Sequence, residues 1–372
     1  MRVATISPDS DAPYMPQLDG LRAIAFLAVA VSHWAPGFLS NMVPWGTGVQ
    51  LFFVLSGFLI TTLLLDELEE TGNLDVGLFY LRRFLRLTPA LLLMIGAYLI
   101  LAPLAWPDIA LHTDVRDVLI STFYLSDYAS AFWSLPRYLR HTWSLSVEQH
   151  FYVLWPLLLL VLTKRLNRSQ LATALGAMYV VFTGWRIYCD MQGDTGYMHS
   201  YFRFDTRLSG LTIGSLMAVL MSGLRRPAKP HLANLAAMAG LAVIALCSAS
   251  FHLESTAAMV VGIPAVEIST LALLYVAVNV EGALVQRALA HPLPAFIGKM
   301  SYGIYLWHYP IFAYLWDRYP WYVILVGGGT VSLLLAILSY YTIERLARQY
   351  ARTLKASEAS TNGRRPEMAS MR

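Results

Sequence analysis

The feature that most constrains this chain is a series of long apolar runs separated by short polar breaks. An α-helix needs about 20 mostly apolar residues to cross the hydrocarbon core of a bilayer. The runs lie at residues 19–37, 48–65, 85–105, 144–163, 170–189, 205–223, 232–250, 258–279, 295–316 and 321–343. They predict an all-α fold, a polytopic transmembrane bundle of about ten spanning helices.

The composition agrees with a membrane protein. Of the 372 residues, 57% are hydrophobic and only 13% are charged, whereas soluble domains carry about 25% charged residues. The net charge of +4 does not indicate nucleic acid, because the basic residues lie between apolar runs, as membrane topology requires. We therefore expect a multi-pass protein of the cytoplasmic membrane, in contact with membrane lipid.

The distribution of basic residues predicts the orientation. Cytoplasmic loops of membrane proteins carry an excess of Lys and Arg. With the N-terminus in the cytoplasm, the basic clusters on that side are Arg82, Arg83 and Arg86; Lys164, Arg165 and Arg168; Arg225, Arg226 and Lys229; Arg287; and Arg345, Arg348, Arg352, Lys355, Arg364 and Arg365. We expect both termini in the cytoplasm. Counting 115–133 as a span would invert this pattern, so we expect that segment to be a re-entrant or surface helix.

The chain divides into three parts. We assign 1–17 to a cytoplasmic tail, 18–345 to the transmembrane domain and 346–372 to a disordered basic tail. Residues 1–17 lack a basic segment followed by an apolar stretch, so we expect no cleavable signal peptide. Cys189 and Cys247 stand alone in apolar segments, which gives neither a disulfide framework nor metal-ligand spacing. We expect no bound metal or cofactor.

Two ionisable residues of the first run are candidate functional groups, because charges inside spans are costly. Arg22 and His33 are eleven residues apart, so they share a helix face about 16 Å apart along the axis. A cation at the inner mouth suits an anionic donor, and an imidazole deeper in the bundle suits a general base. The alternative is that Arg22 pairs with Asp19 and that His33 is an interfacial residue.

A cluster of arginines opens the third run. Arg82, Arg83 and Arg86 lie within two helical turns and make a multidentate phosphate site. A nucleotide-bearing donor such as coenzyme A offers several phosphates. The alternative is that the positive-inside rule alone places arginines here.

The fourth run begins with the motif HTWSLSVEQHFYVLWP. Ser146 followed by Gln149 predicts a capping box and a helix that begins at Ser146. Glu148 would then lie in the first turn, where the helix dipole favours its charged form. It would orient or activate His33 if the two helices touch, or simply provide a favourable N-terminal charge.

Two later runs carry further polar groups. In the ninth run, Ser301, Tyr305 and His308 fall on one helix face, and Pro310 frees the carbonyl of Leu306 for a side chain or water. This stripe lines a cavity or makes helix–helix hydrogen bonds. Arg203, Asp205 and Arg207 open the sixth run; they form a mutual structural pair or face an acceptor.

Several blocks occur in an order that resembles a known family. They are LDGLRAIAFLAVAVSHW, GVQLFFVLSGFLIT, FYLRRFLRLTPALLL, WSLSVEQHFYVLWP, RFDTRLSGLTIGSLMA, ISTLALL, SYGIYLWHYPI and YYTIERLAR. Over about residues 16–348 the chain resembles the membrane-bound acyltransferase-3 family, which acylates bacterial surface glycans and some antibiotics. Many members carry an additional soluble SGNH-type domain. This chain has no room for one after the last run, so we expect a stand-alone module.

The resemblance implies roles for particular residues. Arg22 and His33 match the family's arginine and histidine of the first span, Arg83 and Arg86 match its paired arginines, and Glu148 matches its SVEEQFY-like glutamate. Gln149 and His150 depart from that motif. The implied donor is acetyl-CoA or another acyl-CoA.

We therefore expect acyl transfer from cytoplasmic acyl-CoA to a hydroxyl of a glycan, glycolipid or macrolide on the other side. His33 and Glu148 would be catalytic, Arg22 and the arginines of the third run would bind the donor, and the remaining candidates would line the cavity. Those cavity-lining residues are Asp19, Ser146, Ser301, Tyr305 and His308. The alternatives are a transporter or flippase for an acidic solute or lipid, which predicts inverted repeats with broken helices, and a non-catalytic sensor or assembly protein.

Overall fold

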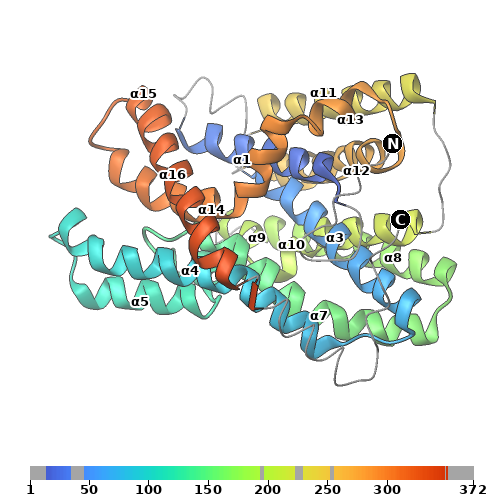
Figure 1. Cartoon of the computed structure of the whole chain (residues 1–372), viewed down its shortest axis with the longest axis horizontal. Helices are drawn as coiled ribbons and strands as arrows, with labels where there is room; N and C mark the ends of the chain where they lie inside the picture. Colours follow the sequence, from blue (N-terminus) through green and yellow to red (C-terminus); the bar gives the residue numbers. More distant parts are fainter. Residues whose placement is uncertain are drawn as a thin grey trace, which may run out of the picture.

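In a computed structural model, residues 14–34, 46–192, 197–222, 229–251, 255–347 and 349–350 can be described, and they form helices and connecting turns without a strand (Figure 1). The first half contains α1 (Pro16–Trp34), α3 (Thr47–Thr71), α4 (Val76–Ala105), α5 (Leu111–Thr122), α6 (Ser126–Trp133), α7 (Thr142–Arg165) and α8 (Arg168–Met191). The second half contains α9 (Tyr197–Tyr201), α10 (Phe204–Met221), α11 (Pro230–Ser250), η1 (Ala258–Gly262), α12 (Ile263–Asn279), α13 (Leu284–Leu289), α14 (Pro292–Leu315), α15 (Trp321–Val323), η2 (Ile324–Gly328), α16 (Gly329–Ser339) and η3 (Tyr340–Glu344). The prediction of an all-α bundle is confirmed. The predicted division into a domain and two tails stays a prediction, since 1–13 and 351–372 lie outside the described residues.

All ten apolar runs are helical over most of their length, but the count of ten spans is not confirmed. In the described part of the chain, six helices are long and apolar enough to cross a membrane: α3, α4, α7, α11, the continuous helix of η1 and α12, and the helix Trp321–Ala347. The helices α1, α8, α10 and α14 form where the runs predict them without meeting the same criterion. Three of these four, α1, α10 and α14, carry polar side chains of the sites described below, which lowers their hydropathy.

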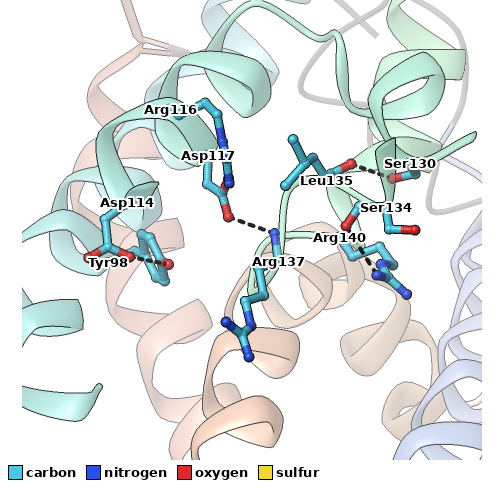
Figure 2. A network of polar contacts seen from close by, with 9 residues as sticks. All are labelled: Tyr98, Asp114, Arg116, Asp117, Ser130, Ser134, Leu135, Arg137 and Arg140. Atoms are coloured by element: carbon cyan, nitrogen blue, oxygen red, sulfur yellow. Dashed lines mark hydrogen bonds and ion pairs between the residues drawn. The ribbon is translucent and has the colours of Figure 1, made fainter. Parts of the chain in front are cut away.

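Segment 115–133 forms two short helices, as its polarity suggests. α5 and α6 have 12 and 8 residues, fewer than the roughly 20 needed to span a bilayer. The carboxylates of Asp114 and Asp117 are buried and accept hydrogen bonds from neighbouring segments of the protein (Figure 2). Asp114 accepts a hydrogen bond from the Tyr98 hydroxyl at 3.0 Å, and Asp117 accepts one from the backbone N–H of Arg137 at 2.6 Å. Burial with hydrogen-bonding partners explains why the acidic residues are tolerated here.

The predicted start of the fourth spanning helix is wrong. α7 begins at Thr142, one turn before Ser146, and no capping box forms there. The Ser146 hydroxyl donates to the Thr142 carbonyl at 3.1 Å and accepts from the backbone N–H of Ser126 at 3.2 Å. Thr142 is itself held by Ser126 on α6 at 2.7 Å, so a tertiary contact sets the helix start. Glu148 therefore lies in the second turn, and the prediction that it occupies the first turn is also wrong.

Close backbone contact joins two helix pairs, α1 with α14 and α3 with α10, which make the largest interfaces of the molecule. A Cβ atom on Gly298 of α14 would lie 1.7 Å from the Asp19 carbonyl oxygen of α1. On the other pair, a Cβ atom on Gly57 would lie 1.9 Å from the Leu211 carbonyl oxygen, and one on Gly214 would lie 2.0 Å from that of Val54. Small residues that let helix backbones approach are typical of membrane bundles.

The α1–α14 contact can be tested with one methyl group. Gly298→Ala should lower the free energy of unfolding by about 1–3 kcal/mol, because overpacking against a backbone atom forces the helices apart. Gly176→Ala on α8 is the matched control, since a Cβ atom there meets nothing within 4 Å and alanine favours a helix. Thermal unfolding in nanodiscs compares the two variants. Equal midpoints would contradict the close contact.

Candidate active site

A first polar cluster surrounds Glu148 of α7. The Ser56 hydroxyl of α3 donates a hydrogen bond to the Glu148 carboxylate, and the Tyr152 hydroxyl donates to Ser56 at 3.1 Å. The guanidinium of Arg83 lies 5.5 Å from the centroid of the Tyr152 ring. Arg22 and Arg83 both interact electrostatically with Glu148. The fold thus brings two predicted site residues, Arg22 of α1 and Arg83 of α4, near the carboxylate of a third, Glu148 of α7.

The remaining donor-binding candidates lie on the same side of the bundle. Arg82 and Arg86 are both half-buried near Arg83 on α4. Arg22 forms the ion pair with Asp19 that was the alternative interpretation, at 2.8 Å, and the Tyr14 hydroxyl donates to the same carboxylate at 2.8 Å. A guanidinium has five N–H donors, so this pair does not use up its capacity to bind an anion.

A second cluster contains three histidines from three elements. The ring of His308 on α14 lies 5.3 Å from that of His33 on α1 and 5.6 Å from that of His141, which precedes α7. Tyr305 and Tyr309 flank them, with ring centroids 5.1 Å from His308 and 5.4 Å from His33 respectively. The structure thus places Tyr305 and His308 of the predicted polar stripe on α14 in this cluster, and their role in a site stays a prediction. Ser301 is buried on the same helix face, seven residues before His308.

Hydrogen bonds fix the protonation pattern of two of these rings. His141 Nε2 lies 3.1 Å from the Leu306 carbonyl oxygen, and His308 Nδ1 contacts the Tyr305 carbonyl oxygen. A carbonyl only accepts, so each of these nitrogens carries the proton of the neutral ring. The opposite nitrogens, His141 Nδ1 and His308 Nε2, have no hydrogen-bond partner among the described residues. Each neutral ring thus keeps an unprotonated nitrogen that can accept a proton.

His141 was not identified from the sequence. The carbonyl of Leu306, which Pro310 frees by lacking an N–H, was expected to meet a side chain or water, and His141 is that side chain. The only signal in the sequence was that His141 is the first residue of the motif HTWSLSVEQHFYVLWP, directly before the fourth run. Its partner is 165 residues away in the chain, so the pairing required the fold.

Polar side chains on one face of α7 lie between the two clusters. Ser144 and Glu148 are four residues apart and therefore share a face of that helix. The Ser144 hydroxyl lies 2.6 Å from that of Tyr305. The described contacts place Glu148 with Ser56 and His33 with His308. Direct orientation of His33 by Glu148 stays a prediction.

The cavity-lining candidates do not line the cavity that the described residues enclose beside α10. That cavity has a volume of about 30 Å³. Its walls come from α3, α10, α11, η1 and α12 and from short turns, and none of Asp19, Ser146, Ser301, Tyr305 and His308 belongs to them. The five residues instead make ion pairs, hydrogen bonds or ring contacts within the bundle, or are simply buried there, as Ser301 is.

A buried ionic network near this cavity was also missed. Glu267 on α12 and Arg186 on α8 are both fully buried, with Arg186 Nη1 3.7 Å from Glu267 Oε1. Ser209 of α10 donates to the same carboxylate oxygen at 2.6 Å, and Gln50 of α3 donates to it as well. The network joins four helices that a linear pattern does not relate.

The pair expected at the start of the sixth run is confirmed only in part. Arg203 Nε donates to Asp205 Oδ1 at 2.9 Å, and the Trp185 indole donates to Asp205 Oδ2 at 2.7 Å. Arg207 lies apart from them, buried against the ring of Tyr201.

Comparison with known families decides the class of protein. The acyltransferase-3 family model, described as an acyltransferase domain, matches residues 15–341. The chain belongs to the acyltransferase-3 family. The family makes it an acyltransferase, and its apolar helices make it a multi-pass membrane protein.

Curated relatives agree with the family. The chain is 30% identical over 356 residues to O-acetyltransferase OatA of Staphylococcus aureus strain NCTC 8325, an alignment that covers 90% of this chain and 57% of the relative. It is 30% identical over 351 residues to the putative O-acetyltransferase SAS0844 of S. aureus strain MSSA476, covering 89% and 57%. The chain thus spans little more than half the length of these relatives. No solved structure matches it.

The buried network predicts a large effect of removing its carboxylate. Glu267→Leu should destabilise the protein by about 3–5 kcal/mol, because it leaves the buried guanidinium of Arg186 uncompensated. Glu281→Leu is the matched control, since Glu281 is exposed just after α12. Thermal unfolding of both variants in nanodiscs is the measurement. If the Glu267→Leu variant is as stable as Glu281→Leu, the pairing of Glu267 with Arg186 does not contribute to stability.

Proposed function

We propose that the protein transfers a short acyl group, such as acetyl, from cytoplasmic acyl-CoA to a hydroxyl of an extracytoplasmic glycan or glycosylated acceptor. The observation that carries this proposal is the line of polar side chains that joins an arginine cluster to a histidine cluster through an apolar bundle. The family supports acyl transfer, and the names of the relatives support oxygen as the acceptor atom. The basic loops support a cytoplasmic position for both termini and for the donor.

The arginine cluster is the donor end. Arg83 and Arg86 hold phosphates of the donor, with Arg82 in support, because guanidinium groups bind phosphates with paired hydrogen bonds. Arg22, held in place by Asp19, guides the arm that carries the thioester toward Glu148. The anionic nucleotide then stays at the membrane surface and only the uncharged arm enters the bundle.

The histidine cluster is the acceptor end. His33 takes the proton of the acceptor hydroxyl as its oxygen attacks the acyl carbon; the carbon–oxygen bond forms, the carbon–sulfur bond breaks, and the leaving thiolate takes up a proton. His308 and His141 line the place of attack with unprotonated nitrogens, and Tyr305 links them to α7. The reaction exchanges a thioester for an ester and requires no metal.

Replacing the proposed base should abolish transfer. His33→Ala should reduce acyl transfer by about 100- to 10,000-fold, the usual contribution of a general base. The measurement is surface acetyl ester per cell, or labelled acceptor formed in membranes from radioactive acetyl-CoA. His112→Ala is the control, since His112 is exposed on α5. Unchanged transfer by His33→Ala at equal protein level would defeat the assignment.

The donor end makes a separate kinetic prediction. Arg83→Gln should raise the KM for acyl-CoA by about 10- to 100-fold, because a hydrogen bond to a charged group contributes about 1.5–3 kcal/mol. Arg165→Gln is the matched control: it removes an exposed arginine at the end of α7. Equal KM values for the two variants would place the donor elsewhere.

A further inference from the structure

Arg207 is a buried cation that lacks hydrogen bonds. It is 1% exposed, and its Nε, Nη1 and Nη2 atoms have no hydrogen-bond partner among the described residues. A guanidinium carries five N–H donors, and leaving a buried charged group without partners is costly. Such an arginine within a membrane bundle indicates a function.

Aromatic rings surround Arg207 but do not accept conventional hydrogen bonds from its guanidinium. The Tyr201 ring centroid lies 4.4 Å from the guanidinium carbon, and those of Phe53 and Trp143 lie 5.6 Å from it. Cation–π contacts stabilise the charge by about 2 kcal/mol when desolvated. They do not replace the hydrogen bonds of the N–H groups.

The neighbouring carboxylates have other partners. Glu267 interacts electrostatically with Arg207 but pairs with Arg186 and accepts from Ser209. Asp205 is bound by Arg203. Asp190 is half-buried and accepts from Ser200 at 2.7 Å. In the part of the chain that the structure describes, no carboxylate hydrogen-bonds Arg207.

A cavity adjoins this guanidinium. Arg207 and Gln50 line the cavity of about 30 Å³, and Cys247, Phe251 and Val266 form an apolar wall. A single water needs about 10–15 Å³ of such space, so the volume suits a group of two or three heavy atoms. The cavity is therefore cationic with unpaired donors at one end and apolar at the other.

We propose that this cavity binds a carboxylate group. A carboxylate is planar and pairs with a guanidinium through two parallel hydrogen bonds. Its three heavy atoms match the size of the space, so only the carboxylate group itself enters the cavity. The carboxylate has two chemical sources, a short free acid released by hydrolysis of an acyl donor or an acidic sugar of the acceptor. Trp143, which contacts Arg207, is next in the chain to Ser144, which contacts Tyr305; the assignment of the acid to the donor or the acceptor rests on the proposed function.

Direct binding tests the proposal. Purified protein in nanodiscs is titrated with radiolabelled acetate at constant ionic strength, and bound label is competed with glucuronate or with glucose. Wild type should bind acetate saturably and glucose should not compete. Competition by glucuronate assigns the site to an acidic sugar, and lack of it assigns the site to a free short acid.

Variants separate the cavity from general charge effects. Arg207→Gln should weaken acetate binding at least tenfold. Arg318→Gln should not, although Arg318 also lies 4.4 Å from a tyrosine ring, that of Tyr314, on an exposed turn. Ala258→Leu adds bulk to the cavity lining and leaves the guanidinium in place. It should abolish binding, which covers the case that Arg207→Gln does not fold.

Failure of this proposal can be distinguished from failure of the proposed function. Arg83→Gln at the donor end should keep wild-type affinity for acetate, so loss of transfer activity does not bear on this site. Two results would overturn the proposal: no saturable acetate binding by wild type, or wild-type affinity in Ala258→Leu and in any folded Arg207→Gln.

Discussion

The backbone contact between α1 and α14 is the constraint on which the proposed site depends. The absence of a side chain at Gly298 lets the Asp19 carbonyl approach α14 to a distance that no other residue permits. That approach fixes the two helices along their length. Further along, the same pair brings His33 and His308 to a ring separation of 5.3 Å. Asp19 also pairs with Arg22, so one helix contact positions groups of both clusters.

The cost of charge in a bilayer organises the rest of the bundle. Asp127 is fully buried on α6 and meets the His150 imidazole of α7 at 3.2 Å. Glu267 meets Arg186, and Glu148 meets the Ser56 hydroxyl. Each of these contacts joins different helices, so it offsets desolvation and specifies which helices are neighbours. Arg207 differs from these buried charges, because its guanidinium has no hydrogen-bond partner among the described residues.

Local sequence patterns predicted the helices. Contacts between distant segments determine the features that these patterns did not predict. Apolar length predicted a helix for each run, and the polar stripe of α14 was visible because Tyr305 and His308 share a helix face. The start of α7 was predicted wrongly, because Thr142 bonds to Ser126 in a separate short helix. The Glu267 network was out of reach, since Gln50 and Glu267 are 217 residues apart. Polarity also explains why α1 and α10 are not counted among the spanning helices: Asp19, Arg22 and His33 lower the hydropathy of α1, and Asp205 and Arg207 lower that of α10.

The central claim is that one polar line carries an acyl group across the bilayer. It is tested most directly in proteoliposomes with a single orientation of the protein, with radioactive acetyl-CoA on the side of the arginine cluster and a soluble glycan acceptor on the other side. The account predicts label on the acceptor while intact acetyl-CoA stays on its own side. Label found only on acceptor placed with the donor, and none across the membrane, would contradict it.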